Sequence, residues 1–220
     1  MYVGPGSPGS EFGSGKRVMP AVAVAEQRAL TRIQATTPHA YVPFGQRVVA
    51  SGVLEGWTGT GWQPLAGRAV TVSGGPDDPA ARHVVTNQAG AYETNVRAMF
   101  SFEAGQAYFA GDHCWLAAYS HPSVQVHARL TCAPSEAVVA VGREVRVSGK
   151  VVPGAMPVWL EQFADSGWTR VTEPVRADAE GRYGVTFRPT VSGLLRMRVW
   201  TDGTEAGVLP YSREFTLSVG

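Results

Sequence analysis

From Thr31 onward, small hydrophobic residues alternate with polar residues along short segments of the chain. The segments Arg47–Gly52 and Val145–Ser148 place Val, Ala or Gly at every second position. A period of two is expected of a β-strand that buries one face and exposes the other. The pattern therefore predicts strands almost throughout. The only helix candidate is Val24–Arg32, which is long enough for one or two turns.

Further segments combine this pattern with β-branched and aromatic residues, which favour strands. They are Arg68–Ser73, Tyr92–Arg97, Gln106–Gly111 and Ser123–His127, followed by Pro157–Glu161, Tyr183–Arg188, Leu194–Trp200 and Arg213–Val219. Turn signals separate them at intervals of about 8 to 12 residues, which is typical of an antiparallel sandwich. We therefore predict an all-β fold built from antiparallel β-sandwiches.

The chain is a tandem repeat with a period of roughly ninety-odd residues. Three matches define it, Gly45–Gly52 with Gly142–Gly149, Asn87–Tyr92 with Asp178–Tyr183, and Tyr119–Ser120 with Tyr211–Ser212, at offsets of 97, 91 and 92 residues. In the second match, an Asn or Asp side chain accepts a backbone hydrogen bond, and a Gly supplies a positive φ before the next strand. Each repeat is therefore expected to be one sandwich.

The repeat predicts a first domain at residues 31–127 and a second at residues 128–220. Residues 1–15 are rich in Gly, Pro and Ser, and we interpret them as an expression tag and linker. Residues 16–30 form an N-terminal segment in which Pro20–Val24 resembles Pro122–Val126. This segment is either the tail of a preceding repeat, which we favour, or the remnant of a small-residue cleavage site.

Several segments resemble the immunoglobulin-like repeats of bacterial, especially actinobacterial, secreted and surface proteins. They read VGREVRVSGKVVPG (141–154), SGWTRV (166–171), DAEGRY (178–183) and LLRMRVW (194–200). In the first repeat, GWQPLAGRAVTV (61–72) is also similar to carboxypeptidase-regulatory-like, transthyretin-like sandwiches. The resemblance covers roughly residues 31–219. It implies two tandem immunoglobulin-like sandwiches, export from the cell and a modular architecture, but no active site.

The charges of the chain are balanced, with 19 basic and 18 acidic residues and a net charge of +1. Neither repeat has the basic excess that neutralises nucleic-acid phosphates, so we expect no nucleic-acid partner. No apolar run approaches the length of about eighteen residues that a membrane helix needs, so we expect no membrane insertion. A protein or a glycan remains as the expected partner.

Residues capable of catalysis or metal binding are present but poorly spaced. The five histidines are His39, His83, His113, His121 and His127. No Gly-x-Ser-x-Gly elbow accompanies them, and we expect no catalytic residues. Asp112–Cys114 with His121 and His127 matches no zinc spacing, and Asp77–Asp78 offers too few oxygens for calcium. We therefore expect a non-enzyme without metal or cofactor.

Two tryptophans form the strongest candidate for a ligand-binding site. Trp57 and Trp62 flank the polar, Gly-containing loop Thr58–Gly61, which has no counterpart in the second repeat. Two indoles beside a loop can stack on sugar rings or anchor a protein partner. Alternatively, they form a cross-strand pair that closes a hairpin, which we favour. Trp159, Trp168 and Trp200 lie in or beside predicted strands and are interpreted as core or sheet-face packing.

The chain contains two cysteines, Cys114 and Cys132. The repeat register places Cys114 in the loop before the last strand of the first domain and Cys132 where the second domain begins. A strand between them would hold their Cα atoms about 20 Å apart, too far for a disulfide. In the alternative, Cys114–Tyr119 is a strand that pairs with Ser123–Cys132 as a hairpin. We favour the register and expect two free thiols.

Together, these features predict a non-catalytic, extracellular or cell-surface module that acts as a spacer and an adhesion-type interaction domain pair. We expect it to be part of a longer multidomain chain. The alternative is an accessory carbohydrate-binding region of a secreted hydrolase, with Trp57 and Trp62 as the binding residues.

Overall fold

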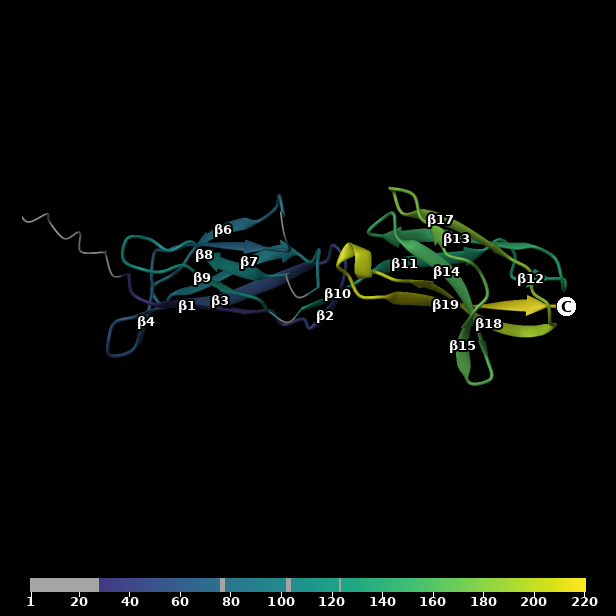
Figure 1. Cartoon of the computed structure of the whole chain (residues 1–220), viewed down its shortest axis with the longest axis horizontal. Coiled ribbons are helices and arrows are strands. Elements are labelled where there is room, and N and C mark those ends of the chain that lie inside the picture. Colours follow the sequence, from purple (N-terminus) through teal and green to yellow (C-terminus); the bar gives the residue numbers. More distant parts are fainter. Residues whose placement is uncertain (1–27, 76–77, 102–103, 123) are drawn as a thin grey trace, which may run out of the picture.

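The alternating segments form strands that lie in two groups, end to end along the long axis of the molecule (Figure 1). The structure, a computed structural model, describes residues 28–75, 78–101, 104–122 and 124–220. The predictions for residues 1–27 lie outside this part of the chain. Of the helix candidate Val24–Arg32, the described residues 28–32 are not helical, because Ala29 forms a β-bridge with Trp115 and a strand begins at Thr31.

We call the two groups the first lobe (β1 to β10) and the second lobe (β11 to β19). The strands of the first lobe are β1 (Thr31–Thr36), β2 (Tyr41–Pro43), β3 (Arg47–Trp57), β4 (Trp62–Pro64), β5 (Ala69–Ser73), β6 (Arg82–Val85), β7 (Ala91–Arg97), β8 (Gln106–Phe109), β9 (Ala118–Ser120) and β10 (Gln125–His127). The strands β3 and β4 are joined by the short loop that contains Thr58–Gly61.

The second lobe follows after one residue. Its elements are β11 (Arg129–Pro134), β12 (Val138–Val139), β13 (Val145–Val152), β14 (Pro157–Ala164), β15 (Gly167–Arg170), β16 (Val175–Arg176), β17 (Arg182–Phe187), β18 (Gly193–Thr201), the 3-10 turn η1 (Thr204–Ala206) and β19 (Tyr211–Val219). A single residue, Ala128, therefore joins β10 to β11.

Both lobes have the strand order of an immunoglobulin-like sandwich. In the second lobe, β11-β13-β17 forms one sheet, and β12-β19-β18-β14-β15 forms the other, with β16 beside β14. In the first lobe, β3 pairs with β1, β4 and β7, the second sheet runs β6-β5-β8-β9, and β2 pairs with β10. Among the described residues, all pairs of named strands are antiparallel except the equivalent pairs β10–β2 and β12–β19. The predicted all-β, immunoglobulin-like fold class is confirmed.

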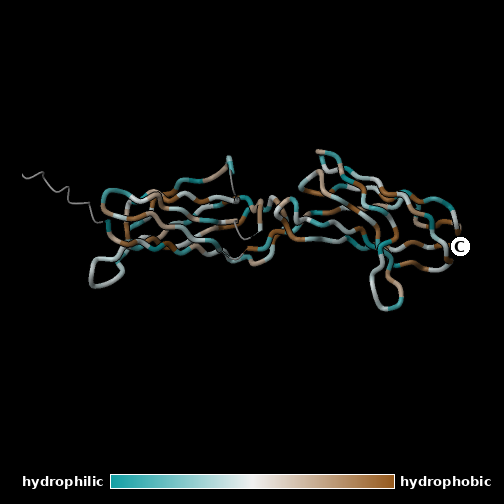
Figure 2. The backbone as a smooth tube through the Cα atoms, in the orientation of Figure 1, coloured by the Kyte–Doolittle hydropathy of each residue, from teal (hydrophilic) through white to brown (hydrophobic). Residues whose placement is uncertain are grey.

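The period of two places apolar side chains in the core. Val145 and Val147 of β13 are fully buried, as are Val158 and Leu160 of β14. Hydrophobic and hydrophilic stretches alternate along the strands of both lobes (Figure 2). Each fully buried aliphatic side chain contributes about 1.5–3 kcal/mol relative to exposure, which makes this alternation the main stabilising feature of the fold.

A glycine and a tyrosine mark the same position in both repeats. Gly52 pairs with Tyr92, and Gly149 pairs with Tyr183, at the offsets predicted from the sequence. The Tyr92 hydroxyl donates to the carbonyl of Gln34 at 2.7 Å, and the Tyr183 hydroxyl donates to the carbonyl of Thr131 at 2.5 Å. Burial raises the pKa of both tyrosines, so both phenols stay protonated and serve as donors.

Candidate functional site

Trp57 and Trp62 close the hairpin between β3 and β4. They are direct cross-strand partners, and their rings meet edge to face, with centroids 5.6 Å apart and planes at 63°. The loop between them is held by Thr58, whose backbone N–H and hydroxyl both donate to the Gly61 carbonyl at 3.0 Å. The predicted cross-strand tryptophan pair is confirmed.

Neighbouring charges cover part of this pair. The Arg32 guanidinium lies 4.5 Å from the centre of the Trp62 ring, and its Nε is 2.6 Å from a Glu55 carboxylate oxygen. Trp57 keeps 37% of its surface exposed. Two indoles at 63°, one of them under an arginine, do not form a flat platform, whereas cation–π contact and edge packing both stabilise the hairpin. Ligand binding by Trp57 and Trp62 stays a prediction.

We expect the double substitution Trp57→Ala with Trp62→Ala to lower the free energy of unfolding by about 1–2 kcal/mol, because it removes an aromatic pair and a cation–π contact. Chemical denaturation measures this change, and Thr60→Ala is the control because it changes the same loop and keeps both indoles. A glycan-array screen provides the second measurement. Unchanged stability with loss of glycan or partner binding would replace the hairpin interpretation by the sugar-binding one.

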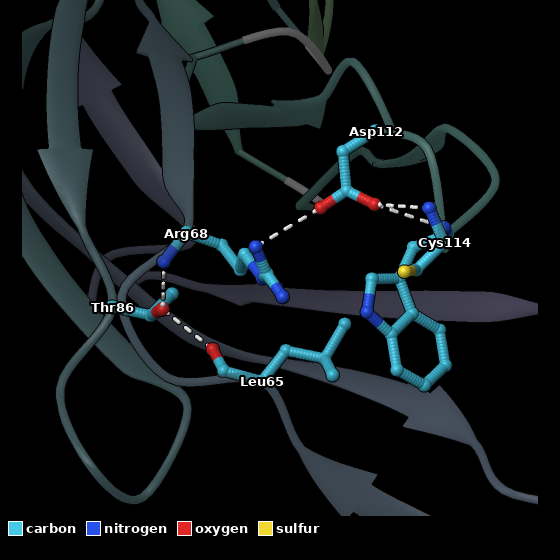
Figure 3. A network of polar contacts seen from close by, with 6 residues as sticks. Leu65, Arg68, Thr86, Asp112 and Cys114 are labelled. Atoms are coloured by element: carbon cyan, nitrogen blue, oxygen red, sulfur yellow. Dashed lines mark hydrogen bonds and ion pairs between the residues drawn. The ribbon is translucent and has the colours of Figure 1, made fainter.

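The loop before β9 is fixed by a network of polar contacts (Figure 3). One Asp112 carboxylate oxygen accepts the backbone N–H groups of Cys114 and Trp115 at 2.8 and 3.0 Å, and the other lies 3.1 Å from Arg68 Nη1. Desolvation raises the pKa of Asp112, but the two N–H donors and Arg68 outweigh it, so the pKa lies below its ordinary value. Thr86 accepts from the Arg68 N–H at 3.0 Å. The carboxylate therefore shapes this loop.

The same loop contains a possible metal-ligand set. The ligand atoms of Asp112, His113 and Cys114 lie within 4.8 Å of one another, but His127 of the sequence-based set is stacked between two tyrosines at the other end of the lobe. One Asp112 oxygen already accepts two backbone N–H groups, the other forms an ion pair with Arg68, and the Arg68 charge opposes a cation. The contacts of Asp112 therefore fit a role in holding the loop conformation better than a role in metal binding.

Cys114 and Cys132 lie in different lobes, and both are free. Because β9 pairs with β8, the alternative hairpin between Cys114–Tyr119 and Ser123–Cys132 is wrong, and the repeat register is right. Cys114 is exposed in its loop, whereas Cys132 is half-buried in β11. Burial raises the pKa of the Cys132 thiol, and the nearby Arg213 only partly offsets this rise.

We expect titration of the denatured, unreduced protein to find both thiols. In the native protein near pH 8, Cys114 should react with a disulfide reagent well before Cys132, because only the thiolate reacts and burial keeps Cys132 protonated to higher pH. The Cys132 reaction should accelerate as the pH rises through its raised pKa. Cys114→Ser serves as the control and should leave only the slow phase; a fast phase in that variant would contradict the assignment.

Aromatic and arginine side chains alternate on the solvent-facing side of β14, β15 and β18. The Arg198 guanidinium lies 4.4 Å from the Trp168 ring centre and 4.5 Å from that of Trp200, and Arg170 lies 4.3 Å from that of Trp159. The predicted sheet-face packing of these tryptophans is confirmed. The contacts of the arginines with these tryptophans were not predicted from the sequence, although the period of two in Arg196–Trp200 places Arg196, Arg198 and Trp200 on one face of the strand.

Neither a known protein family nor a curated protein matches this chain. The adhesin InvE of Yersinia pseudotuberculosis is a similar solved structure, with 13% identity, a TM-score of 0.40, and coverage of 84% of this chain. The chain spans 58% of that adhesin's length. The D0–D1 domain of intimin has 15% identity and a TM-score of 0.32, and the match covers 84% of this chain and 97% of the intimin fragment. The I9–I11 tandem of titin has 10% identity and a TM-score of 0.34, and the match covers 86% of this chain and 65% of the titin fragment.

These similarities carry no functional argument, because both identity and TM-score are low. The class of the chain, an immunoglobulin-like all-β protein, rests on the strand order described above. Within the described residues, no helix is long and apolar enough to cross a membrane.

Proposed function

We propose that the chain is a non-catalytic pair of immunoglobulin-like domains, at residues 31–127 and 128–220, from an extracellular or cell-surface protein. Its role is that of a stiff spacer and adhesion-type interaction module. The observation that carries this proposal is the junction between the lobes, which is packed by side chains from both. The alternative, an accessory glycan-binding region of a secreted hydrolase, depends on Trp57 and Trp62 and is tested by their double substitution.

At the junction, His127 is sandwiched between two tyrosine rings. Its ring centre is 4.4 Å from that of Tyr41 in the first lobe and 4.5 Å from that of Tyr211 in the second, with interplanar angles of 17° and 23°. His127 Nδ1 is 2.8 Å from the Ala128 carbonyl oxygen, and its backbone bridges to Leu209. The last residue of β10 therefore contacts both lobes, which restricts rotation between them.

A second contact lies beside the first. The Ser101 N–H of the first lobe donates to the Gly207 carbonyl of the second at 2.9 Å. Gly207 has a φ of +66°, and a β-carbon there would lie 2.5 Å from the Phe100 ring. A glycine is thus needed both for its conformation and for the approach of Phe100. Two contacts and a one-residue join leave little freedom for a hinge.

The far end of the second lobe repeats the junction end of the first. The Phe44 N–H donates to the His127 carbonyl at 2.8 Å, and the Val141 N–H donates in the same way to the Gly220 carbonyl at 3.1 Å. The Gly45 N–H donates to the Ala98 carbonyl at 2.7 Å in the first lobe, and the Gly142 N–H donates to the Pro189 carbonyl at 2.8 Å in the second. By this register, Tyr41, Phe44 and Phe100 of the junction correspond to Val138, Val141 and Val191.

The three valines leave an apolar surface uncovered. Val138, Val141 and Val191 are 68%, 46% and 51% exposed, and hydrophobic stretches lie beside the C-terminus in Figure 2. Tyr41 stacks on His127, which also stacks on Tyr211 of the next lobe, and Phe100 lies beside Gly207 of that lobe. Because the equivalent end of the first lobe is covered in this way, the exposed surface supports membership of a longer array. We propose that this surface is covered by a further immunoglobulin-like unit joined in tandem. A patch of three valines buries far less than the roughly 800 Å² per partner that a stable complex of separate proteins needs.

We expect small-angle scattering to show an elongated rod, because the His127 stack and the Phe100–Gly207 contact fix the lobes end to end. Phe100→Ala combined with His127→Ala should broaden the distribution of lobe orientations, while each lobe stays folded by circular dichroism. A chain extended after Gly220 by a second copy of residues 128–220 should scatter as a longer rod. A compact, side-by-side pair would contradict the spacer role.

A further inference from the structure

A cavity of about 450 Å³ lies in the first lobe, between β7 and the segment that leads into β6. Its lining includes Arg47, Arg82, Arg97, Thr94, Asn95 and Asp78. This volume falls in the range of roughly 300–1,000 Å³ that is usual for small-molecule sites. Three arginines line it, which gives this concave surface a basic character.

The arginines are placed against the usual rules of strand pairing. Arg47 on β3 and Arg97 on β7 are direct cross-strand partners, and like charges in that position repel each other. In the part of the chain that the structure describes, no carboxylate lies within ion-pair distance of Arg47, Arg82 or Arg97. Asp78 uses its two oxygens to accept the N–H groups of Ala80 and Gly74, both at 2.8 Å.

The second repeat shows which residues occupy the positions of Arg47 and Arg97 in a sandwich without this basic cavity lining. Val48 pairs with Val96 in the first repeat, as Val145 pairs with Phe187 in the second. The residues next to these pairs show that Arg47 and Arg97 correspond to Glu144 and Arg188, which form an ion pair at 3.3 Å. The first repeat thus has an arginine where the second has the glutamate, and its local charge is more positive by two.

We propose that this cavity binds an oxyanion, a carboxylate or sulfate group, carried by a molecule of about the size of a sugar. Guanidinium groups bind such groups through paired, charge-assisted hydrogen bonds, and three arginines line this cavity. Thr94 and Asn95 add neutral polar groups that suit hydroxyls. A compact cavity suits a small ligand rather than an extended peptide. The proposal specifies a ligand chemistry for the proposed interaction role and rests on the interaction part of that role.

The test is an NMR titration of the full chain with glucuronate, with inorganic sulfate and with uncharged glucose as the control. Glucuronate and sulfate are expected to shift amide signals of β3, β6 and β7, more strongly at low than at high ionic strength, and glucose is expected to shift none. If sulfate shifts the amide signals as strongly as glucuronate does, the oxyanion alone is recognised. If sulfate shifts them less, the sugar also contributes to binding. Equal shifts with glucose and glucuronate would overturn the proposal.

The substitution Arg47→Glu separates a ligand-binding role from a structural one. It recreates the pair of the second repeat, so we expect glucuronate binding to weaken about tenfold or more while the thermal stability rises. Arg82→Ala should weaken binding without that rise. Arg129→Glu, on β11 of the second lobe, is the matched control and should leave the binding unchanged. Binding that survives Arg47→Glu, or a response to poly-glutamate but not to glucuronate, would overturn the proposal. Neither outcome changes the elongated shape expected from small-angle scattering, so failure of the ligand proposal can be distinguished from failure of the spacer role.

Discussion

Gly149→Ala is expected to lower the free energy of unfolding by about 3 kcal/mol, the upper end for overpacking of a core. A β-carbon at Gly149 would overlap the Thr131 carbonyl of the neighbouring strand and would lie 2.7 Å from the Tyr183 hydroxyl. The carbonyl belongs to the backbone, so it can move only by disturbing the β11–β13 ladder, and Tyr183 would lose its acceptor. Urea denaturation followed by circular dichroism measures the change.

The matched control is Gly167→Ala on β15. No atom lies within 4 Å of a β-carbon placed there, so the change should stay within about 0.5 kcal/mol. Gly52→Ala should act on the first lobe as Gly149→Ala acts on the second, because its β-carbon would overlap the Gln34 carbonyl and approach Tyr92. A Gly149→Ala variant as stable as Gly167→Ala would show that the glycine–tyrosine pair does not constrain the sandwich.

The fold was predictable because its determinants are local or repeated. Gly149 and Tyr183 stand at the same spacing as Gly52 and Tyr92 apart from a six-residue difference in the loops, and the strands carry a clear period of two. The hairpin pair of Trp57 and Trp62 was predictable for the same reason, because only four residues separate them. The helix candidate Val24–Arg32 is wrong at its described end, because Thr31 and Arg32 pair with β3, and such pairing overrides a weak local helix preference.

The candidate sites were harder to predict because they depend on register between distant strands. The stack of His127 between Tyr41 and Tyr211 joins residues more than eighty positions apart. The Arg47–Arg97 pair becomes visible only when the two repeats are aligned strand by strand, which reveals Glu144 in place of Arg47. Side-chain contacts between lobes or across sheets leave no periodic signal in a single sequence.

Arg198→Ala is expected to lower the free energy of unfolding by about 3 kcal/mol. Its Nε and Nη2 lie 2.7 and 2.5 Å from one carboxylate oxygen of Glu161, and Trp159 donates to the other at 2.9 Å. The side chains of Arg198 and Glu161 are only 18% and 13% exposed. Removing one partner of a buried pair costs about 3–5 kcal/mol, because the other charge is left without compensation. The remaining Trp159 donor and partial exposure place the expected cost at the lower end.

Arg196→Ala is the matched control for Arg198→Ala. Arg196 lies two residues earlier on the same strand and face, and its ion pair with Glu214 has the same kind of geometry at 2.9 Å, but the two side chains are 54% and 47% exposed. Water screens such a pair, so its loss should cost less than about 1 kcal/mol. Arg198→Lys keeps the charge but not the planar group that stacks between Trp168 and Trp200, and we expect an intermediate loss. Equal losses for Arg196→Ala and Arg198→Ala in urea denaturation would show that burial of the Glu161–Arg198 pair does not determine its contribution.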